Sequence, residues 1–101
     1  GLGEVLQEAV EHDDDGQPSA TSFMDYAVPA VQDMPELTVE LLATPSTLTP
    51  TRMRGIGEAP AVASPVAVAN AVADALAALG VGEIDMPLTP GRVWAAIQAA
   101  S

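Results

Sequence analysis

The residues with the clearest capacity for chemistry lie together between Arg54 and Glu58. Glu58 carries a carboxylate that could accept a proton as a general base, and Arg54 carries a planar guanidinium that could bind an anionic group. On residue type alone each has an ordinary alternative: a solvated acid that leads a helix, and a surface arginine among many acids. This stretch is therefore the candidate site, with its chemistry still open.

Other groupings of reactive side chains point to no further site. The chain has no cysteine, which excludes disulfides, thiolate zinc sites, iron–sulfur ligation and thiol nucleophiles within it. His12 is the only histidine, so no histidine cluster can form. The acidic run Asp13–Gly16 lacks the ligand spacing and terminal glutamate of a calcium loop and is typical of a solvated turn, and Met24 and Met53 are typical of gap filling. We predict no metal ligated by protein side chains.

Composition narrows the possible partners. Fourteen acids stand against three arginines and no lysine, giving a net charge of −11, which argues against nucleic acid or an anionic membrane as partner. No run of 18 apolar residues and no basic signal region is visible, so the default location is cytoplasmic. The chain has 101 residues and only three of them are aromatic. The stability of a core built mostly on small side chains in a chain of this length would be marginal on its own.

The first 43 residues show the patterns of a helix, then a turn, then two strands. Apolar residues from Leu2 to Ala9 follow a helical period and indicate the end of an amphipathic helix, although residues 5–12 could also form a strand. Asp13–Gly16 supplies turn chemistry, and residues 17–28 are a predicted strand. In 36–43, Leu37, Val39 and Leu41 alternate with polar residues, which is the period of a half-buried strand.

The second half is a loop followed by two helices. Residues 44–64 contain three prolines, which predicts a long irregular loop carrying the candidate site. Ser64-Pro65 supplies a cap and a first helical residue for a helix with the stripe Val68, Val72, Leu76 and Leu79, ending at Gly80. Thr89-Pro90 repeats that start for a short closing helix, and Trp94 is expected to pack. The predicted fold is α+β: a small antiparallel β hairpin or sheet packed with a long Ala/Val-rich helix and a short C-terminal helix.

A colinear set of motifs runs through nearly the whole chain and resembles the C-terminal end of the molybdopterin-binding large subunits of the carbon monoxide dehydrogenase and xanthine dehydrogenase superfamily. It consists of Asp14-Asp15-Gly16-Gln17, Ser22-Phe23-Met24-Asp25-Tyr26, Thr44-Pro45-Ser46, Arg54-Gly55-Ile56-Gly57-Glu58-Ala59, Ala67-Val68-Ala69-Asn70-Ala71-Val72, Pro87-Leu88-Thr89-Pro90 and Arg92-Val93-Trp94. Colinearity makes this far more specific than a lone Gly-x-Gly. The chain, residues 1–101, is accordingly expected to be a single C-terminal segment of a molybdenum-cofactor-binding domain.

The resemblance implies roles for the candidate site. Glu58 corresponds to the family's active-site glutamate, the base in a molybdenum hydroxylase. Arg54, Gly55, Ile56, Gly57 and Ala59 correspond to the loop that binds the molybdenum–pterin cofactor, and the two glycines would let the backbone approach it closely. The implied partners are the remainder of the large subunit and iron–sulfur and flavin subunits or domains, with no nucleic acid and no membrane. The isolated chain is expected to be inactive.

Two departures from the family pattern leave an alternative open. Arg52 stands where relatives carry glycine, and Pro60-Ala61 stands where Gly-Thr is usual. Proline has no backbone N–H to donate to a cofactor. These residues favour a non-catalytic acidic interaction or structural module, a separated or degenerate descendant of the segment, whereas the retained stretch from Gly55 to Glu58 favours the enzyme fragment.

Overall fold

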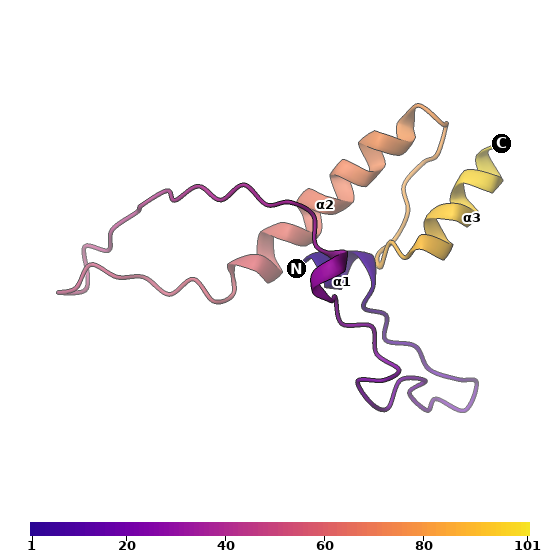
Figure 1. The fold of residues 1–101 in the computed structure, drawn as a ribbon, viewed down its shortest axis with the longest axis horizontal. Helices are drawn as coiled ribbons and strands as arrows, with labels where there is room; N and C mark the ends of the chain where they lie inside the picture. Colours follow the sequence, from indigo (N-terminus) through magenta and orange to yellow (C-terminus); the bar gives the residue numbers. More distant parts are fainter.

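Three α-helices and one short 3-10 helix make up the secondary structure of the computed structural model, which describes all residues from 1 to 101. In chain order they are α1 (Leu2–Leu6), η1 (Val31–Asp33), α2 (Ala59–Ala77) and α3 (Pro90–Ala100). Two long loops extend from the region of α1, one on each side of η1 in the sequence, while α2 and α3 lie on the opposite side of the molecule (Figure 1). The fold is mostly helical.

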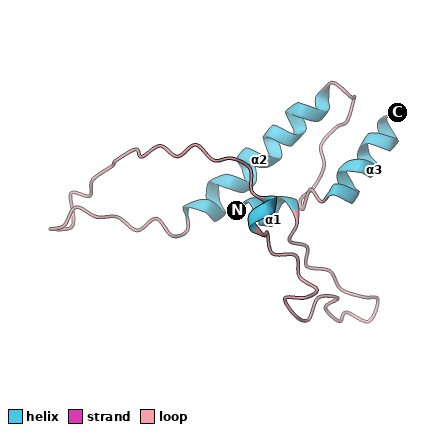
Figure 2. Ribbon diagram, in the orientation of Figure 1, coloured by secondary structure: helices cyan, strands magenta, loops and turns pink.

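The predicted β hairpin is wrong, and with it the α+β fold class. Figure 2 shows no strand, and the only β-type pairing is an isolated antiparallel bridge between His12 and Pro18, across the turn that Asp13–Gly16 forms as predicted. Within 17–28, the Ser22 hydroxyl accepts from the Met24 N–H and donates to Asp25. Serine side chains that bond the local backbone favour turns over strands, which explains why this stretch coils.

The segment 36–43 is extended but is not a strand. No hydrogen bond uses its backbone, and Leu37, Val39 and Leu41 are 60%, 77% and 95% exposed. Its alternating pattern determines only which side chains share a face. A strand also requires a neighbouring segment that forms N–H···O=C hydrogen bonds with it. This chain supplies no such neighbour.

Helix α2 begins six residues before the predicted start at Pro65. Pro60 lies in its first turn, where a helix needs no N–H from proline, so the proline that the sequence analysis placed in the loop favours the helix start. Pro65 lies inside the helix and is buried. The helix ends at Ala77, three residues before the predicted end at Gly80. Gly80 lies in the turn that follows and has a left-handed φ of 73°.

The predicted start of the closing helix is also confirmed. Thr89 caps α3, and its side chain accepts from the Arg92 N–H at 3.4 Å, with Pro90 as the first helical residue. The expectation that Trp94 packs is not met within this chain, because Trp94 is 65% exposed. It lies with Val93 and Ile97 along an apolar groove of about 470 Å³ between α3 and α1.

The core is very small. Only five of 101 residues are buried; they include Val5 and Leu88, whose backbones are hydrogen-bonded to each other. The radius of gyration is 17.7 Å, compared with about 13 Å for a compact domain of this length. Large apolar side chains remain uncovered along both long loops and on the helices, so most of the apolar surface has no partner within this chain.

Helix α2 is long and apolar enough, by length and composition, to cross a membrane, which the sequence analysis did not anticipate. The core helix of a larger soluble protein has the same properties. The helix contacts α1 through Val68 and its neighbours, and Val68, Val72 and Leu76 are half-buried as the stripe predicts, while Leu79 is 54% exposed.

A side-chain hydrogen bond joins the loop before η1 to Glu8, two residues after the end of α1. The Tyr26 hydroxyl donates to the Glu8 carboxylate at 3.0 Å. This hydrogen bond, followed by partial burial and the charges of Glu8 and Glu4, raises the pKa of Tyr26 above its ordinary value of 10.0. A raised pKa in the folded state means that the contact stabilises the fold below pH 10.0 and that this stability is lost as the pH rises through the folded pKa.

We therefore expect the single tyrosine to ionise at a higher pH in the folded chain than in denaturant, as followed by tyrosinate absorbance. Glu8→Gln should bring the two titrations closer together because it removes the carboxylate acceptor and its charge. Identical titrations in folded and denatured chain would contradict the contact.

Candidate functional site

The candidate site lies on an extended arm, residues 34–58, which leaves the body of the molecule near η1 and returns at the start of α2 (Figure 1). Its tip, residues 45–54, is held by its own hydrogen bonds. The Ser46 N–H donates to the Arg52 carbonyl at 2.9 Å, and the Thr49 hydroxyl donates to the Met53 carbonyl at 3.2 Å. Ser46 is only 7% exposed, so the tip is a preformed turn on an otherwise unbonded arm.

Arg52 closes this turn in a left-handed conformation with a φ of 59°, and no other non-glycine residue in the chain has a positive φ. Its N–H donates to the Thr49 carbonyl at 3.0 Å. A non-glycine residue in this conformation costs roughly 1 to 2 kcal/mol. The backbone here thus favours glycine, and Arg52 adopts this conformation despite the cost.

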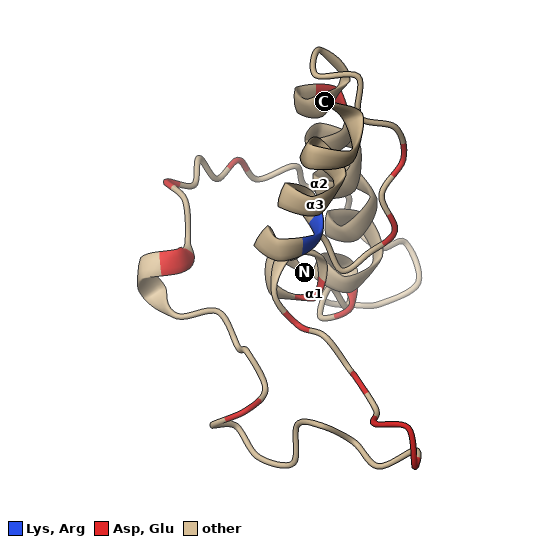
Figure 3. Cartoon of the chain, turned by 90° about the vertical axis from the view of Figure 1, so that its right-hand side faces the viewer, with Lys and Arg blue, Asp and Glu red and all other residues tan.

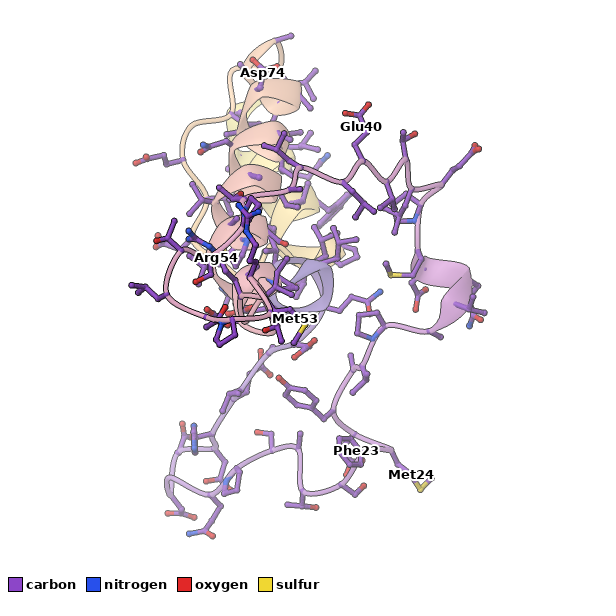
Figure 4. The ribbon with its side chains drawn as sticks, turned by 90° about the vertical axis from the view of Figure 1, so that its left-hand side faces the viewer. Phe23, Met24, Glu40, Met53, Arg54 and Asp74 are labelled. Atoms are coloured by element: carbon purple, nitrogen blue, oxygen red, sulfur yellow. The ribbon has the colours of Figure 1, made fainter.

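Arg54 lies two residues after Arg52, and its guanidinium donates to the Pro45 carbonyl at 3.3 Å, on the other side of the tip. Figure 4 looks onto the arm and shows Met53 and Arg54 projecting from it. The backbone N–H groups of residues 53–58 donate to nothing in the chain. A guanidinium and a run of free N–H groups therefore lie on one short stretch, and this donor set is suited to anionic oxygen atoms.

Gly55 and Gly57 are not required by the conformation of this chain. Neither has a positive φ, and a Cβ built at either position would meet nothing within 4 Å. Gly3, by contrast, would clash with Pro29 if it carried a Cβ. The backbone at Gly55 and Gly57 is therefore open to a close approach by a group from outside this chain.

Glu58 stands at the N-cap of α2, and its side chain makes no capping hydrogen bond. The Glu58 carbonyl accepts from the Ala61 and Val62 N–H groups at 3.0 and 3.2 Å, which anchors its backbone at the helix end. The structure thus presents a free carboxylate oxygen pair on a fixed helix end.

Ile56 and Ala59 complete the predicted set. Ile56 is 76% exposed, and Ala59 is the first residue of α2. All six predicted residues lie on one continuous stretch that joins the arm to α2, and all are exposed. The larger hollows lie instead around α1, η1 and α3, and none is lined by residues 44–59. This chain therefore supplies one open wall of a site.

Reasoning from the sequence missed the part that Ser46, Thr49 and Arg52 play in shaping the tip. The Thr-Pro-Ser-Thr composition of this stretch predicts turns, but the partner of each hydroxyl could not be read from it. No group of three His, Cys, Asp or Glu side chains gathers in a position to bind a metal ion.

Comparison with known proteins gives strong and colinear matches. The nicotine 6-hydroxylase large subunit of Paenarthrobacter nicotinovorans is 38% identical over 93 residues, 92% of this chain. Quinoline 2-oxidoreductase from Pseudomonas putida 86 superposes with a TM-score of 0.85 and 42% identity over 96% of the chain. The Cu,Mo-CO dehydrogenase superposes with a TM-score of 0.83 and 31% identity over 95% of the chain. The chain belongs with the large subunits of molybdenum hydroxylases.

The match covers only a part of those proteins. The chain spans 11% of the length of the nicotine 6-hydroxylase large subunit and 12% of each of the two solved structures. No protein-family model matches it. What is established is a segment of a molybdenum hydroxylase large subunit, whose fold agrees with these solved structures over nearly its whole length.

Proposed function

We propose that this chain is the C-terminal segment of the molybdenum-cofactor-binding large subunit of a molybdenum hydroxylase, an oxidoreductase similar to carbon monoxide dehydrogenase or to xanthine and aldehyde oxidases. Its share of the active site is the stretch 54–59, with Glu58 as the catalytic base. The observation that carries the proposal is this contiguous exposed stretch, in which free N–H groups, a guanidinium and two glycines unexplained by the chain itself precede a free carboxylate.

The residues present fit an anionic, oxygen-rich cofactor. Arg54 and the backbone N–H groups of the loop would bind its anionic oxygens, and Gly55 and Gly57 would admit it close to the backbone. When bound, the molybdenum–pterin cofactor supplies the redox chemistry. Ile56 would contribute an apolar contact, and Ala59 would place the cofactor against the N-terminal end of α2.

Glu58 would accept a proton from the nucleophilic water or hydroxide that attacks the substrate carbon. Its carboxylate is available for this task because it makes no capping hydrogen bond to the start of α2. Closing the site against bulk water requires the remainder of the large subunit, since all six residues are exposed here. Proton acceptance by a positioned side chain contributes about 10²- to 10⁴-fold in rate.

The uncovered apolar surface supports the proposed partners. With five buried residues, the chain needs another polypeptide against α2, α3 and the arm, and we propose the remainder of the large subunit in that place. Iron–sulfur and flavin subunits or domains would carry the electrons onward. We place the assembled enzyme in the cytoplasm, with α2 as a core helix inside the subunit.

The alternative of a non-catalytic acidic module rested on Arg52 and Pro60. Arg52 adopts the left-handed conformation expected of the glycine that it replaces, and Pro60 lies in the first turn of α2, where no N–H is needed. Both residues fit the backbone of this chain, Arg52 at a cost of roughly 1 to 2 kcal/mol. We therefore favour the enzyme segment over the module.

The proposal is tested on the native product that contains this sequence, purified through an affinity tag. We expect an intact mass far above 10.3 kDa, or a co-purifying large-subunit polypeptide, together with bound molybdenum. The isolated 101-residue chain should oxidise none of the substrates that the assembly oxidises, because one base without cofactor and electron acceptors cannot complete a turnover. A native product of 10.3 kDa without molybdenum or partner would refute the proposal.

A further inference from the structure

Arg52 occupies a position where the backbone itself favours another residue. With a φ of 59° at the turn of the arm tip, glycine would be the least costly choice. The tip is closed by bonds to backbone atoms of Arg52, namely Ser46 N–H to its carbonyl and its own N–H to Thr49, and glycine could make both. The arginine side chain therefore contributes nothing to the shape of the turn.

Arg52 is also the one arginine in this chain whose guanidinium donates no hydrogen bond. Arg54 donates to the Pro45 carbonyl and Arg92 donates to the Met86 carbonyl, whereas the Arg52 side chain donates to nothing. The chain has fourteen acids, drawn red in Figure 3. None of them lies in the tip, residues 45–54. A free cation on a strongly acidic chain is suited to an anionic group that another molecule supplies.

The surroundings of Arg52 indicate what kind of molecule that is. Leu48 and Met53, on the same tip, are 93% and 69% exposed, and the side chain of Met53 projects from the arm in Figure 4. Apolar side chains beside an arginine are typical of protein interfaces, where arginine and methionine are enriched. A site for a small anion alone would have no use for two exposed apolar side chains.

We propose that Arg52, with Leu48 and Met53, docks the arm tip onto a carboxylate-bearing surface of the remainder of the large subunit. This inference rests on the proposed function, because it takes that subunit as the partner. Arg52 pairs with an aspartate or glutamate there, while Leu48 and Met53 cover apolar surface around the pair. Arg52 is then a positioning residue, which holds the far end of the loop whose other end carries Glu58.

The test compares Arg52→Gly and Arg52→Lys with the matched control Arg92→Gln in the complete native enzyme. Docking predicts that Arg52→Gly lowers the midpoint of thermal unfolding by a few degrees, although glycine relieves the backbone strain. The decrease should be smaller at high ionic strength, because salt screens the lost pair. Arg52→Lys should lower the midpoint less than Arg52→Gly does, because it keeps the positive charge. Arg92→Gln removes a cation that already donates a hydrogen bond within the chain, and it should also lower the midpoint less than Arg52→Gly does.

A midpoint of thermal unfolding that does not fall in Arg52→Gly overturns the inference. A midpoint that stays the same or rises in Arg52→Gly would mean that Arg52 is a strained surface residue without a partner. Loss of molybdenum at an unchanged midpoint would mean that Arg52 binds the cofactor, which also excludes docking. Failure of the proposed function looks different, since it appears in the unmodified protein as the absence of any larger subunit or of molybdenum.

Discussion

Replacing Glu58 with glutamine in the assembled enzyme should lower turnover by about 10²- to 10⁴-fold while leaving the bound molybdenum unchanged. Glutamine keeps the size and the hydrogen-bonding oxygen of the side chain but cannot accept a proton. The backbone of Glu58 should stay in place, because its carbonyl is fixed by the first turn of α2. The effect should therefore fall on chemistry and not on cofactor loading.

The measurement is kcat together with molybdenum content on the same preparation. The control is Glu83→Gln, because Glu83 is an exposed acid in the linker between α2 and α3 and far along the chain from the arm. Full activity in Glu58→Gln would leave the stretch 54–59 as scaffold. Activity and molybdenum lost in proportion would assign Glu58 to cofactor binding and remove it as the base.

The second large effect is expected from Gly57→Val. Within this chain a side chain at 57 would meet nothing within 4 Å, and the same holds for Gly82, which makes Gly82→Val a matched control. If the cofactor lies against the loop, the valine at 57 should displace it and lower activity by about 10²-fold, the usual cost of a misplacement near 1 Å. The valine at 82 should be tolerated.

The comparison is made by molybdenum content and kcat of the two assembled variants, with the midpoint of thermal unfolding as the measure of folding. Equal molybdenum and equal activity in Gly57→Val and in the unmodified enzyme would show that nothing approaches Gly57 closely. Equal losses in both variants would assign the effect to general packing.

The helices were predictable to the extent that their signals are local. Thr89-Pro90 marks the start of α3 through the conformation of two residues, and this prediction is confirmed. Gly80 lies in the turn after α2, three residues beyond the end of the helix at Ala77. Pro60 was wrongly assigned to the loop. Proline is found both in loops and in the first turn of a helix, and the residues that follow it decide between the two. The start of α2 was thus placed six residues late.

The strand predictions were wrong for a different reason. The alternation in 36–43 depends on that segment alone, but a strand also needs a second segment that exchanges backbone hydrogen bonds with it. No segment of this chain forms such bonds with 36–43. The candidate site was accessible from sequence because its residues are contiguous. The residues that would cover the site could not be predicted, because they do not belong to these 101 residues. The same limit applies to Trp94, which is apolar and exposed because nothing here covers it.

The small core has a consequence for how this segment tolerates change. Val62 and Val66 on α2, like Trp94 on α3, are well exposed here, and they would be covered only after assembly. A polar replacement at such a position leaves the chemistry of each finished molecule intact but lets fewer molecules reach the finished state. Most harmful variants in this segment should therefore reduce the amount of enzyme that a cell accumulates, with catalysis per molecule unaltered.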